Sequence, residues 1–496
     1  MTETISLERL LQGCEAEKLH LSGAIQSFGA MLCLHSEGLR VTHASANLKD
    51  FVGVTPGEVL GRAGVDLPWF PAEQITALGA PTGQTLSVRG VVHDALGRID
   101  ALLIRGDGFI LLELERNNTP VEPIALQHLQ QSFISAPHND EDMTHYHQAL
   151  VLAFRRIIGF DRVMLYRFAP DWSGEVIAEA TADGVGSYHG LHFPASDIPA
   201  IARNLYLVNP ARMIPDALAN PVALLGLGAS VPDLTRSDLR SVSPVHLQYL
   251  VNMGVSASFS VPVRMAGQLW GLVACHNHTA QLLTPDQRNA CVTLANTYAL
   301  GLSSYIVGQR LQKIDRLERR IDAVLAQLAA YSDPLDGIES NAQALMETLN
   351  AQGFAVAIHD NVVIDGDGPD LDGLAHIDDW FVNQSKEFVF CSDHLVDVFP
   401  GSLQVLAAAS GMIAIKAKTT RSGWVRFYWF RQAEPQHVAW AGNPNKPMLE
   451  NAGALTLSPR RSFDRWVENK SDYSRPWSME EQTVAAKLRS NLLRWL

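Results

Sequence analysis

Cysteine is the residue type in this sequence that offers covalent chemistry, and Cys14 has the surroundings that suit such chemistry best. The five cysteines are odd in number, widely spaced and without a CxxC pair, which argues against a disulfide framework, a zinc site or a redox dithiol. Cys33, Cys275, Cys291 and Cys391 lie in apolar or structured contexts, where a free cysteine is usually a small buried hydrophobe. Cys14 lies in the polar segment LLQGCEAEKLH, where a thiol can react as its thiolate. The alternative is an exposed thiol without a role.

A second candidate site is a set of polar residues within segments that otherwise have the pattern of a buried core. These are Tyr166, Asp197, Tyr206, Arg212, Arg240, His246, Tyr249, Ser258, Ser260 and His276. Polar groups in an interior need partners, and a ligand rich in carboxylates and N–H groups would supply them. Each residue alone is more often structural than ligand-binding. Together they predict a pocket.

Other chemistry has little support in the sequence. It contains no HExxH, P-loop or GxSxG motif, and nothing identifies a nucleophile, base and orienting group, so no catalytic residues and no enzyme activity are expected. The nearest metal candidate, Cys275-His276-Asn277-His278, ends a predicted strand, where adjacent residues point to opposite faces. We therefore expect no metal site.

The composition predicts a globular protein of several modules. A chain of 496 residues is too long for one core, and its length suggests about three domains. The net charge of −13 argues against nucleic acid or an anionic membrane as a partner. No apolar run of 18 residues and no basic, apolar leader is present, so we expect a cytoplasmic protein that does not cross a membrane.

Two α+β modules are predicted in the first 300 residues. In residues 20–120, alternation around Ser36-Glu37-Gly38 predicts a hairpin followed by a helix, with further strands at TLSVRGVV, RIDALLIRG and GFILLELER. The second module begins with an amphipathic helix around Asp140 to Ile158 and has strands at DRVMLYRFAP, GEVIAEA and SASFSVPVRMAGQLWGLVACHNH. Roughly 75 irregular residues separate its strand sets, and such a stretch is usually functional.

A long helix is predicted from Pro285 to about Leu328, before a third module at roughly 330–496. Its apolar positions have coiled-coil-like spacing, at Ile314, Leu317, Ile321, Val324 and Leu328. This seam fits a dimer interface and packing on the same chain equally well. The third module has strands at GFAVAIHD and GMIAIKA, a terminal helix near Met479 to Leu496, and a long excursion of some 45 residues after a β-prone run.

Four segments in a fixed order resemble the bacteriophytochromes: HFPASDIPAIARNLY (192–206), LRSVSPVHLQYLVNMGVSASFS (239–260), LWGLVACHNH (269–278) and SPRRSF (458–463). The resemblance covers the whole chain. It implies an α+β, multidomain PAS-GAF-PHY protein with antiparallel sheets, a long connecting helix, an N-terminal figure-of-eight knot and a PHY tongue. The implied parts are an N-terminal segment (1–19), PAS (20–122), GAF (123–305), connecting helix (306–330) and PHY (331–496), with the tongue at about 422–468. In the knot, the segment around Ile25 passes through a GAF loop within 220–242.

The resemblance also implies a red/far-red photoreceptor that carries biliverdin IXα, a linear tetrapyrrole, as a thioether on Cys14. Plant and cyanobacterial relatives attach their bilin through a GAF cysteine, whose place is taken here by Val245. Carried over position by position, the Asp197 carbonyl faces the pyrrole N–H groups and Ile198 lies against the bilin. The other implied contacts are Arg212, Arg240, Ser258 and Ser260 at the propionates, His246 near the pyrrole water, His276 at the D-ring carbonyl, and Tyr166, Tyr206 and Tyr249 around the D ring.

Signalling is expected to follow D-ring isomerisation. The resemblance places Trp424 to Phe430 and the PRRSF motif in the tongue, and we expect Asp197 to pair with Arg460 in one state and with Ser462 or the moved D ring in the other. The tongue's β-prone first arm and helix-compatible second arm (RRSFDRWVENK) fit a hairpin-to-helix switch. An output module, a histidine kinase in the expected parent protein, lies outside this chain, and a homodimer through the GAF and connecting helices is expected.

Some positions depart from the family pattern. Ser22-Gly23 and Ser27-Phe28 replace the usual Pro-Gly and Pro-His near the knot, and Leu191 replaces a polar residue near the D ring. HLQYL lacks the Cys-Glu of relatives that rest in the far-red form, so a red-absorbing dark state is expected. The alternative function is a PAS/GAF regulatory protein that senses a cyclic nucleotide or other small molecule without light chemistry.

Overall fold

The computed structural model describes residues 18–94, 97–117, 123–228, 230–359, 361–400, 405, 408–419, 423–444, 448–451, 454–457 and 462–495. Contacts divide the chain into two compact units. The first contains Met1–Ser304 together with Ala439–Trp466, and the second contains Tyr305–Val438 together with Val467–Leu496. Mixed helices and mainly antiparallel sheets form both units, as the sequence predicts.

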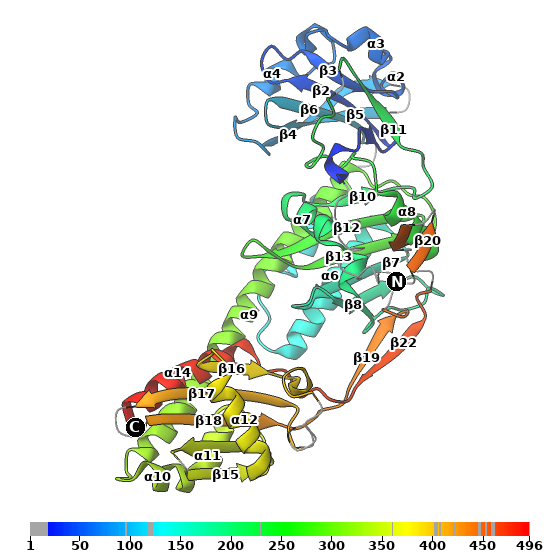
Figure 1. Cartoon of the computed structure of the whole chain (residues 1–496). Coiled ribbons are helices and arrows are strands. Elements are labelled where there is room, and N and C mark those ends of the chain that lie inside the picture. The colour runs from blue at the N-terminus through cyan, green and yellow to red at the C-terminus, as the bar shows by residue number, and fades with distance from the viewer. Residues whose placement is uncertain are drawn as a thin grey trace. The chain divides into compact units, whose positions relative to one another are not determined.

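The first unit begins with a seven-stranded sheet in the order β1-β11-β3-β2-β6-β5-β4. Its strands are β1 (Ala24–Ile25), β2 (Gly29–His35), β3 (Val41–Ser45), β4 (Thr85–Asp94), β5 (Gly97–Arg105), β6 (Phe109–Arg116) and β11 (Val222–Gly226). The short helices α2 (Lys49–Val52), α3 (Pro56–Val59) and α4 (Ala72–Ile75) contribute to its apolar core. The predicted hairpin, helix and three later strands are all present. Strand β11 comes from far along the chain and lies beside the N-terminal strands (Figure 1).

The N-terminal thread, residues 23–26, is hydrogen bonded on both sides by one later loop. On one side β1 pairs with β11, with Ile25 opposite Val222. On the other side, Gln26 N donates to the Leu239 carbonyl at 2.6 Å, and Ile25 forms a bridge with Arg240. The thread therefore passes between the two arms of the loop, which is the arrangement expected for the figure-of-eight knot.

The second sheet of the first unit has eight strands in the order β10-β12-β13-β7-β8-β9-β19-β22. Its last two strands, β19 and β22, belong to a hairpin that is described below. Its strands within the second module are β7 (Arg162–Phe168), β8 (Gly174–Thr181), β9 (His192–Phe193), β10 (Arg212–Ile214), β12 (Ala257–Met265) and β13 (Gln268–Asn277). The helices are α5 (Pro123–Gln131), α6 (Asp140–Ile158), α7 (Ala200–Val208) and α8 (Pro244–Asn252). Helix α6 begins at an Asn139 side chain that accepts from Asp142 N and ends at Gly159, which has φ +69°.

Helix α9 runs from Pro285 to Leu328. Among the described residues it alone is long and apolar enough to meet the criterion for a membrane span, which is weak evidence by itself, and 44% of its apolar window is buried in the protein. Leu317, Ile321, Val324 and Leu328 are buried in the core of the second unit. These four positions of the predicted seam therefore pack on their own chain, and a dimer contact would have to use other faces of α9.

The second unit has a five-stranded sheet in the order β15-β14-β18-β17-β16. Its strands are β14 (Gly353–Ile358), β15 (Asn361–Gly366), β16 (Val389–Ser392), β17 (Gly411–Thr419) and β18 (Gly423–Arg431), and its helices are α10 (Pro334–Ser340), α11 (Ala342–Thr348), α12 (Leu371–Asn383) and α14 (Met479–Trp495). Alternating residues of β18 point to opposite faces. Phe427 and Trp429 enter one core with α9, α10, α11 and α14, whereas Tyr428 and Phe430 enter the other with α12.

This placement of β18 corrects one expectation. Strand β18 pairs with β14 on one side and β17 on the other, so Trp424 to Phe430 belong to the central strand of the core and not to the tongue. The hairpin extension begins after Arg431. It contains β19 (Gln436–Ala441), β20 (Met448–Asn451), β21 (Ala454–Leu457) and β22 (Arg465–Lys470), so its second arm is extended in this structure.

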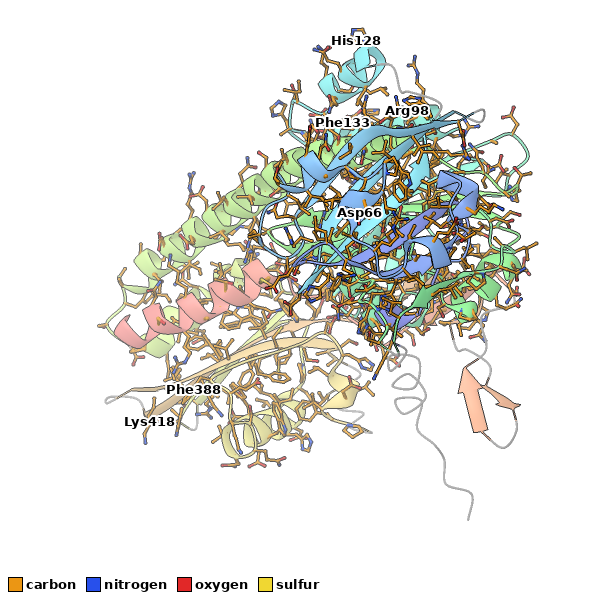
Figure 2. All side chains as sticks on the ribbon, turned by 90° about the horizontal axis from the view of Figure 1, so that it is seen from above. Asp66, Arg98, His128, Phe133, Phe388 and Lys418 are labelled. Carbon is orange, nitrogen blue, oxygen red and sulfur yellow. The ribbon has the colours of Figure 1, made fainter. Side chains whose placement is uncertain are left out.

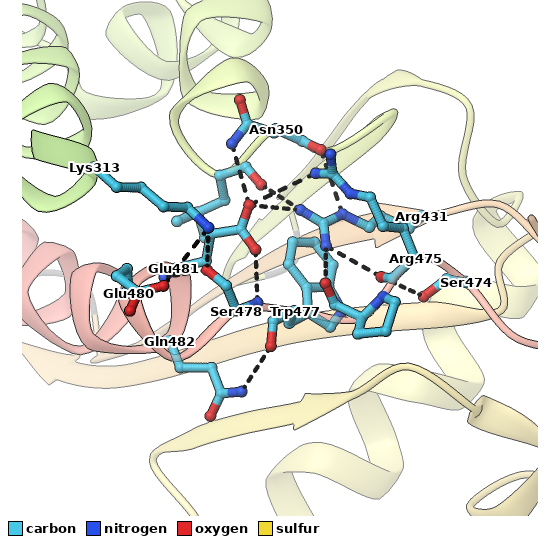
Figure 3. A network of polar contacts seen from close by, with 12 residues as sticks. Lys313, Asn350, Arg431, Ser474, Arg475, Trp477, Ser478, Glu480, Glu481 and Gln482 are labelled. Carbon is cyan, nitrogen blue, oxygen red and sulfur yellow. Dashed lines mark hydrogen bonds and ion pairs between the residues drawn. The ribbon is translucent and has the colours of Figure 1, made fainter. Parts of the chain in front are cut away.

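The two ends of the hairpin extension, where it leaves and rejoins the core, meet at a buried ion pair (Figure 3). Arg431, at the end of β18, donates to Glu481 Oε1 of α14 at 2.9 Å and also to the carbonyls of Arg475 and Pro476, which follow the return arm. Its guanidinium lies 3.5 Å from the centre of the Trp477 ring. The side chains of Arg431 and Glu481 are each only 3% exposed, so this junction is part of the core.

A rim of aromatic and basic side chains lies at the opposite ends of β17 and β18, and Figure 2 labels two of its members, Phe388 and Lys418. Phe388 stacks against Trp424, and Lys418 lies 5.8 Å from the centre of the Trp424 ring. The guanidinium of Arg489 covers the Phe388 ring at 4.7 Å. These contacts shield apolar surface with charged groups, and we assign them no further role.

A buried carboxyl on β6 predicts a pH dependence of stability. Burial raises the pKa of Glu113 from its usual 4.5 to about 8; nearby Glu115 and Asp238 add to the increase, while Ser237 and Arg288 oppose it. The folded state therefore binds the proton of the Glu113 carboxyl more tightly than the unfolded state does. The stabilisation that comes from this protonated carboxyl is complete below about pH 4.5 and is lost as the pH rises to about 8.

Glu113→Gln should remove this loss, so the variant should gain stability relative to the parent as the pH rises between about 5 and 8. Urea unfolding of the N-terminal module over this range would measure the difference. Glu73→Gln, at an exposed position of the same module, is the control. Parallel pH profiles for Glu113→Gln and the parent would contradict this assignment.

Candidate functional site

A cavity in the first unit is enclosed by strands β7, β8, β9, β10, β12 and β13, helices α7 and α8, and the loops that join them. The cavity has a volume of about 270 Å³. A single water molecule needs only roughly 10–15 Å³ on the same measure, so the cavity can hold a much larger ligand. The predicted site residues that line it are Tyr166, Asp197, Ile198, Tyr206, Arg212, Arg240, His246, Tyr249, Ser258, Ser260 and His276. Cys14 lies outside the described residues.

One end of the cavity holds two buried guanidinium groups. Arg212 donates to the carbonyls of Asp238 and Arg240 at 2.7 and 2.5 Å, and Arg240 donates to the carbonyls of Leu234 and Thr235 at 3.2 and 3.1 Å. Among the described ion pairs, neither guanidinium has a carboxylate partner. Burial lowers the pKa of Arg212, and burial together with Arg212 lowers the pKa of Arg240 to about 9. A ligand carboxylate would relieve both effects, so the part of the cavity around Arg212 and Arg240 is the candidate anion-binding end.

Hydroxyl groups surround the same end. Strands β10 and β12 pair with Arg212 opposite Ser260 and Ile214 opposite Ser258, so the two-residue period of β12 places both serines on one face. The Tyr206 hydroxyl lies 2.7 Å from Ser260 Oγ. Burial raises the pKa of Tyr206, with Ser260, Arg212 and Arg240 opposing the increase, so the phenol stays neutral. Tyr206 had been expected with the D-ring aromatics, but its hydroxyl faces the arginine end.

Two histidines line the cavity as neutral imidazoles. Burial lowers the pKa of His246 to about 4 and that of His276 to about 3, in each case with nearby positive charge as a further cause. His276 lies on β13 opposite Ser258, and its buried Nδ1 has no hydrogen-bond partner among the described residues. A buried nitrogen of this kind needs a partner that a ligand carbonyl or N–H can supply. The arrangement therefore fits a ligand with both carboxylates and uncharged polar groups.

Asp197 and the hairpin extension meet at Tyr249. The Tyr249 hydroxyl donates to Asp197 Oδ2 at 3.1 Å, and its ring stacks on His246 and meets the edge of Phe463 at 5.2 Å. Phe463 belongs to the return arm of the extension. Ser462 Oγ donates to Asp464 Oδ2 at 2.9 Å in this structure. Arg460 lies outside the described residues, so its expected pairing with Asp197 stays a prediction.

Aromatic rings pack around Tyr166, which also lines the cavity. The Tyr166 ring meets the edges of Phe168 and Phe193 at 5.1 and 6.0 Å. Leu191 is buried in the same cluster. Sequence reasoning did not select Phe193, Met164 or Leu205 as site residues, because an apolar residue in a buried segment carries no signal that separates a cavity wall from a core. The one available signal was the position of Phe193 inside the HFPASDIP motif.

The residues of the metal candidate Cys275-His276-Asn277-His278 do not point toward a common site. Cys275 is fully buried, while the His278 ring nitrogen Nδ1 lies 2.8 Å from Asp161 Oδ2 at the surface. Among the described residues, no group of three or more His, Cys, Asp or Glu side chains is placed to hold a metal ion.

The structure thus describes a multidomain protein with a cavity lined by arginine, histidine, serine and tyrosine side chains. Residues 14–117 match the PAS fold, residues 146–302 the GAF domain and residues 317–496 the phytochrome region. Cyanobacterial phytochrome B of Nostoc sp. is 32% identical, with 99% of this chain and 67% of the relative covered. The bacteriophytochrome of Pseudomonas aeruginosa is 31% identical, with 97% of this chain and 66% of the relative covered.

The crystal structure of the bacteriophytochrome RpBphP3 from R. palustris superimposes with a TM-score of 0.81 at 30% identity, covering 98% of this chain and 99% of that one. The chain belongs to the phytochrome family of photoreceptors. Its three modules are PAS, GAF and PHY domains, and the cavity lies in the GAF domain. Phytochromes bind a bilin chromophore, and the resemblance inferred from the sequence motifs is confirmed. The chain spans about two thirds of the length of the two relatives.

The position of Tyr166 depends on Gly174, and this dependence can be tested. A Cβ at Gly174 would lie 2.0 Å from Tyr166 Cζ, so Gly174→Ala must displace the ring. Such overpacking should lower stability by about 1–3 kcal/mol. In a Tyr166→Leu background the same glycine change should cost much less, because the ring is gone. Thermal unfolding of the two single variants and the double variant would measure the coupling, and additive effects would rule out this contact as the cause.

Proposed function

We propose that this chain is the light-sensing part of a bacteriophytochrome, with biliverdin IXα held as a thioether on Cys14. The observation that supports this proposal most is the cavity, which combines the guanidiniums of Arg212 and Arg240, neither in an ion pair with a described carboxylate, with two neutral histidines. When bound, the pigment absorbs red light and isomerises at the D-ring methine. Arg212, Arg240, Ser258 and Ser260 would hold its propionates, and His246 and His276 would meet its uncharged polar groups.

The attachment through Cys14 is supported by the chemistry of the other cysteines. Burial raises the pKa of Cys33 to about 11 and that of Cys391 to about 12, and it also raises the pKa of Cys275 and of Cys291. Thiols with such pKa values are poor nucleophiles at neutral pH. Val245 lines the cavity at the position of the attachment cysteine in plant and cyanobacterial relatives. This valine favours biliverdin over the bilins that attach through the GAF domain.

The proposed switch uses Asp197 and the hairpin extension. Asp197 pairs with Arg460 in one state and with Ser462 or the moved D ring in the other, because a carboxylate that loses a partner inside the protein must find another. Tyr249 connects the two parts, since its hydroxyl holds Asp197 and its ring packs on Phe463. The hairpin seen here is one state of the switch, and a helical second arm is the other.

The signal then passes along the helices to an output module, which we propose is a histidine kinase in the parent protein. A homodimer fits the outer face of α9, where Leu300, Val307 and Leu311 are 75%, 54% and 62% exposed. We place the protein in the cytoplasm, with a red-absorbing dark state. The alternative of a cyclic-nucleotide sensor gives no role to residues 317–496, which match the phytochrome region.

Attachment can be tested by replacing the proposed nucleophile. Purified chain supplied with biliverdin should be coloured, change absorbance reversibly under red and far-red light, and fluoresce with zinc on a denaturing gel. Cys14→Ala should keep colour in solution and lose the zinc signal, because only the covalent bond survives denaturation. Cys391→Ser is the matched control and should keep both. Covalent colour in Cys14→Ala would place the attachment elsewhere, and a chain that stays colourless would refute the proposed function.

The switch can be tested at the tongue motif. Arg460→Ala should keep bilin attachment but should reduce the yield or lifetime of the photoproduct, because Asp197 loses the partner that defines one state. Arg461→Ala, the adjacent position of the same motif, should have a smaller effect. Absorbance after a red flash measures both. Photocycle kinetics that are identical in Arg460→Ala and the parent would remove the proposed link to Asp197.

A further inference from the structure

Arg288 connects three separate parts of the first unit, although it is not among the described residues that line the cavity. It lies in the first turn of α9 and is only 7% exposed. Its Nη1 donates to Asp238 Oδ2 of the knot loop and its Nη2 to Glu115 Oε2 of the PAS strand β6. The guanidinium also lies over Phe28, 5.7 Å from the ring centre. Phe28 is one of the departures from the family pattern noted in the sequence.

Asp238, which Arg288 contacts, in turn contacts Arg212 in the wall of the cavity. Its Oδ1 accepts from Met213 N at 2.9 Å, which fixes the start of β10 directly beside Arg212. Its carbonyl accepts from Arg212 Nη1 at 2.7 Å and from Gln26 Nε2 at 3.1 Å. One residue therefore fixes both the backbone and the guanidinium of the anion-binding arginine.

The charges explain why Asp238 needs a partner other than Arg212. The Asp238 carboxylate is close enough to raise the pKa of Arg212 against the effect of burial, so the two groups attract each other. Burial lowers the pKa of Arg288, but Glu115 and Asp238 more than compensate, so Arg288 stays charged between the two carboxylates. An unpaired Asp238 carboxylate would instead draw Arg212 toward itself and away from the cavity.

We propose that Arg288 is a positioning residue for the carboxylate end of the pigment site: by holding Asp238, it leaves Arg212 available to the carboxylates of the ligand. This inference rests on the proposed function, because the ligand carboxylates are the propionates of the bilin. It also gives the PAS domain, through Glu115, a part in a site whose lining is formed mainly by the GAF domain.

The test compares two pigments that differ only at their propionates, which are charged in biliverdin and uncharged methyl esters in biliverdin dimethyl ester. A Cys14→Ala background makes binding reversible, so that absorbance titration measures affinity. Arg288→Met should weaken biliverdin binding by roughly tenfold or more, the effect of a lost charge-assisted contact, and should change ester binding by no more than about twofold. Arg288→Lys should recover part of the loss. Equal weakening of both pigments would overturn the proposal, because a merely structural role acts on both.

A second pair of variants covers the case in which Arg288→Met does not fold, since it leaves two buried carboxylates unpaired. Arg288→Met/Glu115→Gln retains the single Asp238 carboxylate, and Arg288→Met/Glu115→Gln/Asp238→Asn removes it. The double variant should bind biliverdin weakly and the ester normally, and the triple variant should regain biliverdin affinity because Arg212 no longer has a competitor. Equal biliverdin affinities in this pair would also overturn the proposal. A Cys14→Ala parent that binds neither pigment would instead reject the proposed function.

Discussion

The constraint on which this structure depends is that the guanidiniums of Arg212 and Arg240 form no ion pair with a carboxylate in the described part of the chain and are held by backbone carbonyls instead. Arg212 and Arg240 lie in the wall of the GAF cavity and donate to backbone carbonyls, which satisfy their N–H groups but do not neutralise them. Such carbonyls must be held in place, and they all come from residues 234–241 of the knot loop. The irregular loop is therefore the scaffold of the anion-binding end.

Because these carbonyls must be held in place, the knot has a structural role in forming the cavity. A loop without regular secondary structure is normally mobile, yet here the thread of residues 23–26 is hydrogen bonded between its two arms. Arg288 adds a buried ionic contact from α9 and, through Glu115, from the PAS sheet. The N-terminal thread, the PAS domain and the first turn of α9 thus stabilise the same loop. This explains why a pocket lined mainly by the GAF domain also depends on residues of the PAS domain.

The sequence predicted the pocket well because polar residues in buried segments stand out. Arg212, His246 and Ser260 were recognisable for that reason, and the strands that carry them have clear periodicity. The apolar wall, including Phe193, could not be separated from ordinary core. Arg288 was equally hidden, because its partners Glu115 and Asp238 are distant in sequence and a single arginine at a helix start is usually a surface residue. The run WVRFYWF was assigned to the tongue because a β-prone segment fits a hairpin arm and a central strand equally well, and only pairing on both sides decides between them.

The junction of Arg431 and Glu481 has a mechanical consequence. It fixes the two ends of the hairpin extension at one point, so the extension is a closed loop of chain whose ends do not separate freely. A strand rises about 3.3 Å per residue and a helix about 1.5 Å, so the six residues of β22 would shorten by roughly 11 Å on becoming helical. In the proposed hairpin-to-helix switch, the outgoing end stays fixed in the sheet, so that shortening would be taken up by the rest of the extension or would pull on Ser474 and the first turn of α14. The length of chain between the two fixed ends would then set how far the proposed switch moves α14.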